Sequence, residues 1–133
     1  MKTINSSRVA ILEKFLELGR SRDMTALELL VTEDIRINEA QSLPFGGEYV
    51  GWAGYLDVTE KFFGKMRSVR LELIDTWDGP RCSLVAHFVL RAVSKRTQQK
   101  ITMPLLEIWE FEGDKVSAIT PFYHDTHLLS ELL

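Results

Sequence analysis

Glu39 lies where a carboxyl group is costly to bury. It ends the strand-like stretch DIRINEA, whose alternation places Ile35, Ile37 and Glu39 on one face. The two isoleucines mark that face as the inward one. Because an unpaired carboxylate in an apolar interior carries a large free-energy cost, Glu39 is a candidate for chemistry rather than an ordinary surface charge.

Glu107 occupies a similar position in PLLEIWEF, on the same strand face as Leu105 and Trp109. When two carboxyl groups face one small pocket, burial and repulsion push their pKa values apart, so one accepts a proton while the other donates one. Such a pair suits proton abstraction beside a carbonyl, an aldol-type ring closure or a dehydration. These reactions need no metal or organic cofactor, and we expect none. In the alternative interpretation, Glu39 and Glu107 each pair with a tyrosine, tryptophan or arginine and only close the core.

The spacing of apolar residues predicts the elements that would position this pair. Helices are predicted over 7–18, 23–30 and 53–66, and strands over 34–40, 69–77, 82–93, 101–111 and 115–125. The last eight residues are predicted to form a closing helical turn. Because no linker or repeat divides this series, residues 1–133 are predicted to form one α+β domain, with helices mostly early and an antiparallel sheet mostly late.

Composition excludes several classes of partner. The chain has 133 residues, of which 45% are hydrophobic and 26% charged, and a formal net charge of −3, so it lacks the basic footprint of a nucleic-acid binder. Arg8, Glu13 and Lys14 interrupt the N-terminal apolar stretch, which indicates neither a signal peptide nor a membrane span. The single cysteine, Cys82, has no internal disulfide partner and is predicted to be buried on a strand. We therefore expect a cytoplasmic protein.

The strand that carries Glu107 is apolar on both faces at its centre. Leu106 and Ile108 lie on the face opposite Glu107. A sheet with one solvated face alternates more cleanly, so we expect a second subunit to cover this side in a homodimer formed through the sheet. Cover by a loop or tail is the alternative.

The stretch SLPFGGEYVG predicts a tight reversal between the Glu39 strand and the following helix. Pro44 ends the segment that leaves the strand, and Gly46 and Gly47 can adopt backbone angles closed to other residues. Phe45 is predicted to plug the turn. The pair of glycines lacks the strand, GK[ST] and helix context of a phosphate-binding loop, so it indicates no phosphate site.

Three stretches together resemble a known family: FLELGRSRDMTALELLVTEDIRINE, LPFGGEYVG and LLEIWEFEGDKVSAITPFYHDT. They are similar to the SnoaL-like and ketosteroid isomerase-like members of the nuclear transport factor two superfamily. The resemblance implies a curved antiparallel sheet wrapped by three helices into a cone with an internal pocket, a cystatin-like α+β barrel, with the glycine loop at its rim. Members include isomerases, cyclases, dehydratases, epoxide hydrolases and binding proteins without catalysis, so the fold does not specify the reaction.

The resemblance to the ketosteroid isomerases also implies catalytic roles. Glu39 falls where that family places its carboxylate base, and Glu107 where it places a neutral acid that donates a hydrogen bond to the enolate. Phe15 occupies the place of a tyrosine that supplies the other donor, and a missing donor of this kind typically costs about 100- to 1,000-fold in turnover. Tyr123 falls at an aromatic pocket wall, where its hydroxyl could replace part of what Phe15 lacks.

Further residues are candidates for the lining of the pocket. Phe45 comes from the glycine loop and Tyr55 from the buried side of the third predicted helix, while Trp109 is expected to form a wall that raises the pKa of the neighbouring carboxyl group. Asp125 shares a strand face with the tyrosine two residues before it. His87 faces either the pocket or a subunit interface, and in the pocket it would favour a histidine–carboxylate dehydratase.

The sequence thus supports two hypotheses. The first is a small-molecule enzyme of the isomerase, cyclase or lyase type that uses carboxylate acid–base chemistry on an apolar carbonyl compound. The second is a dimeric module without catalysis that binds a small hydrophobic ligand or a partner protein. Replacing Glu39 with glutamine separates them, since an enzyme should lose turnover with little loss of binding.

Overall fold

The computed structural model describes residues 6–133, in which four helices and six strands follow each other. They are α1 (Ser6–Ser21), α2 (Met24–Glu28), β1 (Val31–Glu39), β2 (Gly47–Val50), α3 (Gly51–Gly64), β3 (Met66–Asp78), β4 (Ser83–Ser94), β5 (Lys100–Glu112), β6 (Lys115–Tyr123) and α4 (Thr126–Leu132). The predicted elements are all present. Only the four-residue strand β2 has no counterpart in the sequence analysis.

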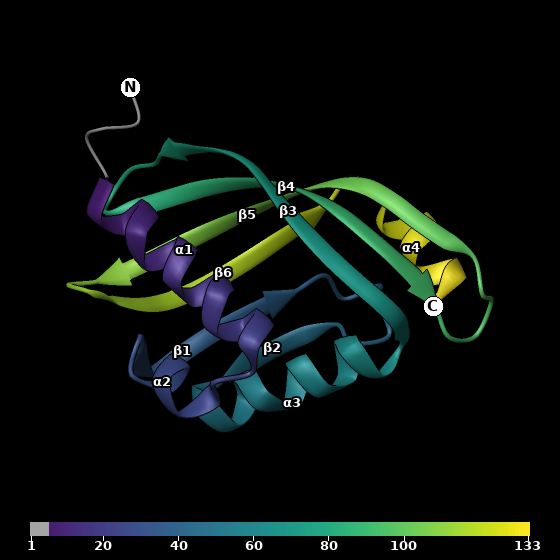
Figure 1. The fold of residues 1–133 in the computed structure, drawn as a ribbon, viewed down its shortest axis with the longest axis horizontal. Coiled ribbons are helices and arrows are strands. Elements are labelled where there is room, and N and C mark those ends of the chain that lie inside the picture. Colours follow the sequence, from purple (N-terminus) through teal and green to yellow (C-terminus); the bar gives the residue numbers. More distant parts are fainter. Residues whose placement is uncertain (1–5) are drawn as a thin grey trace.

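The strands form one sheet in the order β2-β1-β6-β5-β4-β3. Figure 1 shows that this sheet is strongly curved and does not close into a barrel. All neighbouring strands are antiparallel except β1 and β6, which run parallel. The α+β fold with a curved sheet is confirmed, and the parallel pairing of β1 with β6 departs from the expected antiparallel sheet. β1 is an early strand and β6 is the last one, and in the sheet they run in the same direction. No local sequence signal indicates this pairing.

Helices α1, α2 and α3 lie together on one side of the curved sheet (Figure 1), which we call the inner face. The stripe Leu12, Phe15 and Leu18 on α1 is buried, as its spacing predicts. Leu27 of α2 and Val58 of α3 are buried in the same core. The opposite side of the sheet, which these helices do not cover, is the outer face.

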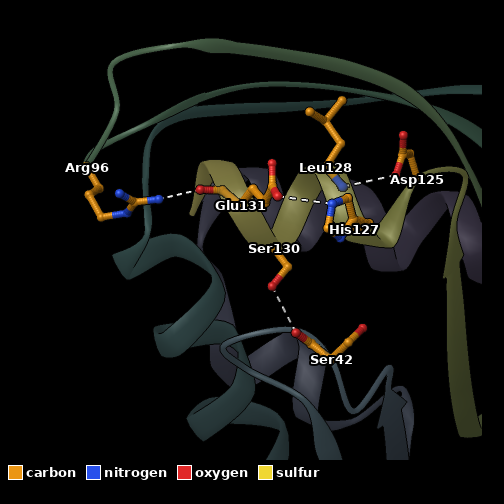
Figure 2. A network of polar contacts seen from close by, with 7 residues as sticks. All are labelled: Ser42, Arg96, Asp125, His127, Leu128, Ser130 and Glu131. Atoms are coloured by element: carbon orange, nitrogen blue, oxygen red, sulfur yellow. Dashed lines mark hydrogen bonds and ion pairs between the residues drawn. The ribbon is translucent and has the colours of Figure 1, made fainter.

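The short helix α4 lies at the end of the molecule far from the start of α1 (Figure 1). Figure 2 shows how it is held: Arg96 of the β4–β5 turn donates to the Glu131 carbonyl, and the Ser130 hydroxyl donates to the Ser42 carbonyl at 3.0 Å. At its start, the Asp125 carboxylate accepts the amide N–H three residues further on, at 2.9 Å. The helix thus connects the β4–β5 turn with the loop after β1.

The glycine loop between β1 and β2 is a tight reversal. A Cβ atom on Gly46 would lie 2.5 Å from the carbonyl oxygen of Ala40, and Gly47 has a φ of +116°. The loop buries Phe45, which is 1% exposed, and the Tyr49 hydroxyl donates to the Phe45 carbonyl at 2.9 Å. Phe45 therefore plugs the turn as predicted.

Gly46→Ala is expected to lower the free energy of unfolding by about 2 kcal/mol or more, because the new methyl group overlaps backbone atoms that cannot rotate away. The matched control is Gly64→Ala at the end of α3, where a Cβ meets nothing within 4 Å. That change should be neutral or stabilise by a few tenths of a kcal/mol. Urea unfolding of both variants measures the difference, and equal effects would contradict this account of the loop.

The turn between β3 and β4 corrects the prediction for Cys82. This cysteine is exposed and has a φ of +61°, and Arg81 before it has a φ of +53°. The Gly79 amide donates to the Ser83 carbonyl at 3.0 Å, which closes the turn around these two residues. The strand therefore starts one residue after Cys82, at Ser83.

Candidate active site

Glu39 and Glu107 lie on either side of the same residue of the central strand β6. Glu107 pairs directly with Pro121. Ile37 of β1 pairs with Ile119, and because these strands are parallel, Glu39 two residues on lies level with Pro121. Two strand spacings separate the two Cα atoms by about 10 Å. Their side chains both project from the inner face, so the register of the sheet brings the carboxyl pair, Glu39 and Glu107, together.

Pro121 lies where the pairing of β6 with β1 has ended, while the pairing of β6 with β5 continues. It has no backbone N–H, so it cannot donate a ladder hydrogen bond. The pairing of β1 with β6 ends just before it, at Ile37 and Ile119. The proline is buried.

Glu107 is held by the indole ring of Trp109. The Trp109 Nε1–H donates to Glu107 Oε1 at 3.0 Å. Burial raises the pKa of Glu107 from 4.5 to about 7, while the hydrogen bond from Trp109 works in the opposite direction by stabilising the carboxylate. The whole residue is only half-buried by accessible surface, but its carboxyl group lies among aromatic rings, so desolvation dominates. We expected Trp109 to raise the pKa of Glu107. Its N–H group instead lowers this pKa.

Glu39 has a different environment. Burial raises its pKa from 4.5 to about 8, the charge of Glu107 adds to the increase, and a hydrogen bond with Tyr123 opposes it. The Oε1 atom of Glu39 is buried and has no hydrogen-bond partner. This orphaned oxygen disfavours the ionised form.

Burial and the charges of the carboxyl pair raise the pKa values of two tyrosine hydroxyl groups. Burial raises the pKa of Tyr123, and the charges of Glu39 and Glu107 and the hydrogen bond to Glu39 add to the increase. Burial also raises the pKa of Tyr55 to about 12, with a hydrogen bond to Thr59 opposing and the charge of Glu107 adding to the shift. Both phenols are therefore neutral at physiological pH and able to donate a hydrogen bond.

Aromatic rings surround these polar groups. Phe15 contacts Trp109 edge-on with ring centroids 4.9 Å apart, and Tyr55 edge-on at 5.7 Å. Trp52 stacks on Tyr55 at 5.1 Å, and Phe45 approaches Tyr123 at 6.4 Å. Trp52 was not predicted as part of this group. Its position three residues before Tyr55 on α3, the helical spacing of one face, is the signal that identifies it.

Two predicted pocket residues do not join this group. His87 pairs with Leu106 on the outer face and stacks on Trp77, with ring centroids 6.2 Å apart. The even-numbered residues of β4 from 84 to 92 are the buried ones, so odd-numbered His87 faces away from the carboxyl pair. Asp125 caps α4 instead.

Other parts of the molecule offer less for chemistry. A surface hollow of about 570 Å³ is lined by exposed charged side chains that include Arg36, Glu48, Arg81 and Glu110, and it does not include the carboxyl pair. We locate the site at the pair because its groups are desolvated and coupled, which the exposed charges are not. Within residues 6–133, no group of three or more His, Cys, Asp or Glu side chains is placed to hold a metal ion.

The helices of residues 6–133 are all too short or too polar to cross a lipid bilayer.

Most of the chain matches a known protein family in sequence. Residues 12–119 match the family model of the SnoaL-like domain. The chain belongs to the SnoaL-like family. No curated protein matches this SnoaL-like chain in sequence.

Solved structures share the fold of this SnoaL-like chain at low sequence identity. A protein of unknown function from Burkholderia pseudomallei, similar to nuclear transport factor two, has a TM-score of 0.84 at 15% identity over 96% of this chain and 97% of its own. A candidate polyketide cyclase from Xanthomonas campestris has a TM-score of 0.75 at 15% identity, over 96% and 100%. A protein with a ketosteroid isomerase-like fold from Catenulispora acidiphila, solved with trimethylamine, has a TM-score of 0.67 at 12% identity, over 83% of each chain. These likenesses confirm the predicted resemblance and the fold.

Proposed function

We propose that this chain is an enzyme of the isomerase, cyclase or lyase type that moves a proton on an apolar carbonyl compound. The observation that carries the proposal is the carboxyl pair, in which the pKa values of Glu107 and Glu39 are raised to about 7 and about 8. A group whose pKa lies near the working pH can both accept and donate a proton efficiently. The SnoaL-like fold and its similarity to a candidate polyketide cyclase support this class of reaction.

Each polar group near the pair has a role in this proposal. One member of the carboxyl pair accepts the proton of the substrate and the other, kept neutral, donates a hydrogen bond, and Tyr123 donates a further hydrogen bond that stabilises the developing oxyanion. Tyr55 is a second donor of the same kind, which compensates for the missing hydroxyl at Phe15. The aromatic rings exclude water and bind the apolar body of the substrate. The similar structure solved with trimethylamine supports the binding of a small ligand at this kind of fold.

Exchange of α-protons tests the proposal without knowledge of the natural substrate. The probe is 2-tetralone, a neutral aromatic ketone, incubated in D2O and followed by proton NMR. The wild type should accelerate exchange above the buffer rate, and the double variant Glu39→Gln/Glu107→Gln should not, while its circular dichroism stays native. If the wild type binds 2-tetralone and related neutral ketones without accelerating exchange, the binding-module hypothesis replaces this one.

The charge of the site predicts which ligands are rejected. No cationic side chain of residues 6–133 shifts the pKa of either glutamate, and at pH 7 the pair carries negative charge. A ligand carboxylate about 5 Å away would cost roughly 3 kcal/mol at an effective dielectric of about 20. We therefore expect 2-naphthoate to bind at least about tenfold more weakly than 2-naphthol by calorimetry at pH 7. Equal affinities, or a preference unchanged in Glu107→Gln, would contradict this.

We also propose that the chain forms a homodimer through the outer face. Leu106 and Phe122 pair across β5 and β6 and are 41% and 55% exposed, and Trp77 on β3 is 49% exposed. Large apolar side chains gathered on one uncovered sheet face are typical of a subunit interface.

Phe122→Glu is expected to convert the dimer into a monomer, because it places a charge at the centre of the apolar face. Phe63→Glu is the matched control: Phe63 is 48% exposed but lies on α3, away from the outer face. Sedimentation equilibrium over a concentration series measures the outcome. A monomeric wild type, or the same behaviour in both variants, would contradict the proposed dimer.

The cytoplasmic location also remains a proposal. Cys82, the single cysteine of the chain, is exposed and free. Exposed unpaired thiols persist in reducing compartments, which supports this location.

A further inference from the structure

The two members of the carboxyl pair receive different hydrogen bonds, and this difference decides which of them is ionised. The indole N–H of Trp109 can only donate, and it donates to Glu107 Oε1 at 3.0 Å. A donor directed at a carboxyl oxygen stabilises the carboxylate form. The bond occupies one oxygen of Glu107 and leaves Oε2 for a ligand.

Glu39 receives one hydrogen bond, from the Tyr123 hydroxyl, which also favours its carboxylate form, but its other surroundings oppose ionisation. Its Oε1 is buried without a hydrogen-bond partner, and an ionised carboxylate with such an oxygen is more costly than a neutral carboxylic acid. The charged or titratable groups that act on it are Glu107, which repels a second negative charge, and Tyr123, whose hydroxyl is neutral. On the side of Glu107, the groups that respond to its charge are Tyr55 and Tyr123, both neutral phenols. Among residues 6–133, no cationic side chain offsets the repulsion.

We propose that the proton held by the pair resides on Glu39, that Glu107 is the carboxylate which accepts the substrate proton, and that Trp109 is the positioning residue that sets this order. The roles are the reverse of those implied by the resemblance to the ketosteroid isomerases. The catalytic part rests on the proposed function, whereas the placement of the proton does not. The higher pKa of Glu39, about 8 against about 7 for Glu107, agrees with this order.

The proton balance of the reaction follows from this assignment. Glu107 removes the proton beside the carbonyl, and the electrons of the C–H bond move into the enolate. Neutral Glu39 donates a hydrogen bond to the enolate oxygen and keeps its own proton. Glu107 then gives the proton to a different carbon of the conjugated enolate, whose electrons form the new C–H bond and re-form the carbonyl group, which completes an isomerisation and restores the starting ionisation state of the pair.

The order of ionisation predicts an asymmetric coupling. If Glu107 ionises first, its charge is present when Glu39 titrates and raises the pKa of Glu39. Glu39 is still neutral while Glu107 titrates, so it has little effect on Glu107.

Carbon NMR titration of protein labelled at the glutamate carboxyl carbons tests the inference, with no substrate needed. In Glu107→Gln, the pKa of Glu39 should fall because the repulsion by Glu107 is lost, but it should stay above the pKa that Glu107 has in Glu39→Gln. In Glu39→Gln, the pKa of Glu107 should move by less than about half a unit. If the pKa of Glu107 shifts more in Glu39→Gln than the pKa of Glu39 shifts in Glu107→Gln, the proposal is overturned and Glu39 is restored as the ionised base. Both substitutions conserve side-chain size, so both variants should fold.

Trp109→Phe tests the positioning role separately. Loss of the N–H donor should raise the pKa of Glu107, so that the difference between the pKa values of Glu39 and Glu107 becomes smaller or changes sign. A merely structural role of Trp109 would not produce this effect. Trp77→Phe on the outer face is the control and should leave both pKa values unchanged. If the pKa of Glu107 is unchanged in Trp109→Phe, Trp109 is not the positioning residue. If the asymmetry holds but no ketone exchanges its protons, the proposed function fails while the proton placement stands.

Discussion

Glu107→Gln is expected to slow proton exchange on 2-tetralone by about 100- to 10,000-fold, the usual contribution of a general base. Glu39→Gln should cost much less, roughly tenfold, because the glutamine amide still donates a hydrogen bond to the enolate oxygen. The wild-type rate should also follow a bell-shaped pH profile. It rises as Glu107 ionises near pH 7 and falls as Glu39 loses its proton near pH 8.

Glu110→Gln is the matched control for this comparison. Glu110 lies on the same strand as Glu107 but is exposed on the outer face, where it pairs with Ala118. Its replacement should leave the exchange rate unchanged. A larger loss in Glu39→Gln than in Glu107→Gln would assign the base to Glu39, and a similar loss in Glu110→Gln would remove the pair from the mechanism.

Stability should fall as pH rises, because the pair is more readily protonated in the folded chain than in the unfolded one. Between pH 4.5, where an unfolded glutamate ionises, and pH 8, where folded Glu39 does, the folded state binds one more proton at this residue. The contribution is therefore fully present below pH 4.5 and is lost as pH rises to 8. Its size for Glu39 is on the order of 4 kcal/mol.

Urea unfolding of the wild type and Glu39→Gln at pH 5, 7 and 9 measures this effect. The variant cannot ionise at this position, so its stability relative to the wild type should increase with pH by several kcal/mol. Taking the difference between the two proteins removes the titration of all other groups. A difference that is constant from pH 5 to pH 9 would contradict the raised pKa of Glu39. A burial this costly is the kind of feature that a functional site retains.

Much of the fold is readable from local periodicity. The stripe Leu12, Phe15 and Leu18 fixes the buried side of α1, and the alternation of Ile35 and Ile37 fixes the inward face of β1. The parallel pairing of β1 with β6 is not readable in this way, because it joins segments about 80 residues apart and leaves no local signature. The short strand β2 is equally hidden, since its four residues follow directly from a loop.

The candidate site is likewise only partly predictable from the sequence. Apolar neighbours on the same strand face are enough to direct Glu39 and Glu107 inward. His87 was ambiguous because β4 is apolar on both faces at its centre, so alternation separates the faces without saying which is inner. The hydrogen bond from Trp109 to Glu107 depends on the orientation of an indole ring, and spacing alone does not determine it.

The most direct measurement of the central claim is a carbon NMR titration of the glutamate carboxyl groups in the wild-type protein. The account predicts two glutamates that titrate between about pH 7 and pH 8, assigned to Glu107 and Glu39 by their absence in the glutamine variants. The carboxyl group of a glutamate in a model peptide titrates at about 4.3. If every glutamate titrates near that value, the buried acid–base pair does not exist, and the proposed chemistry fails with it.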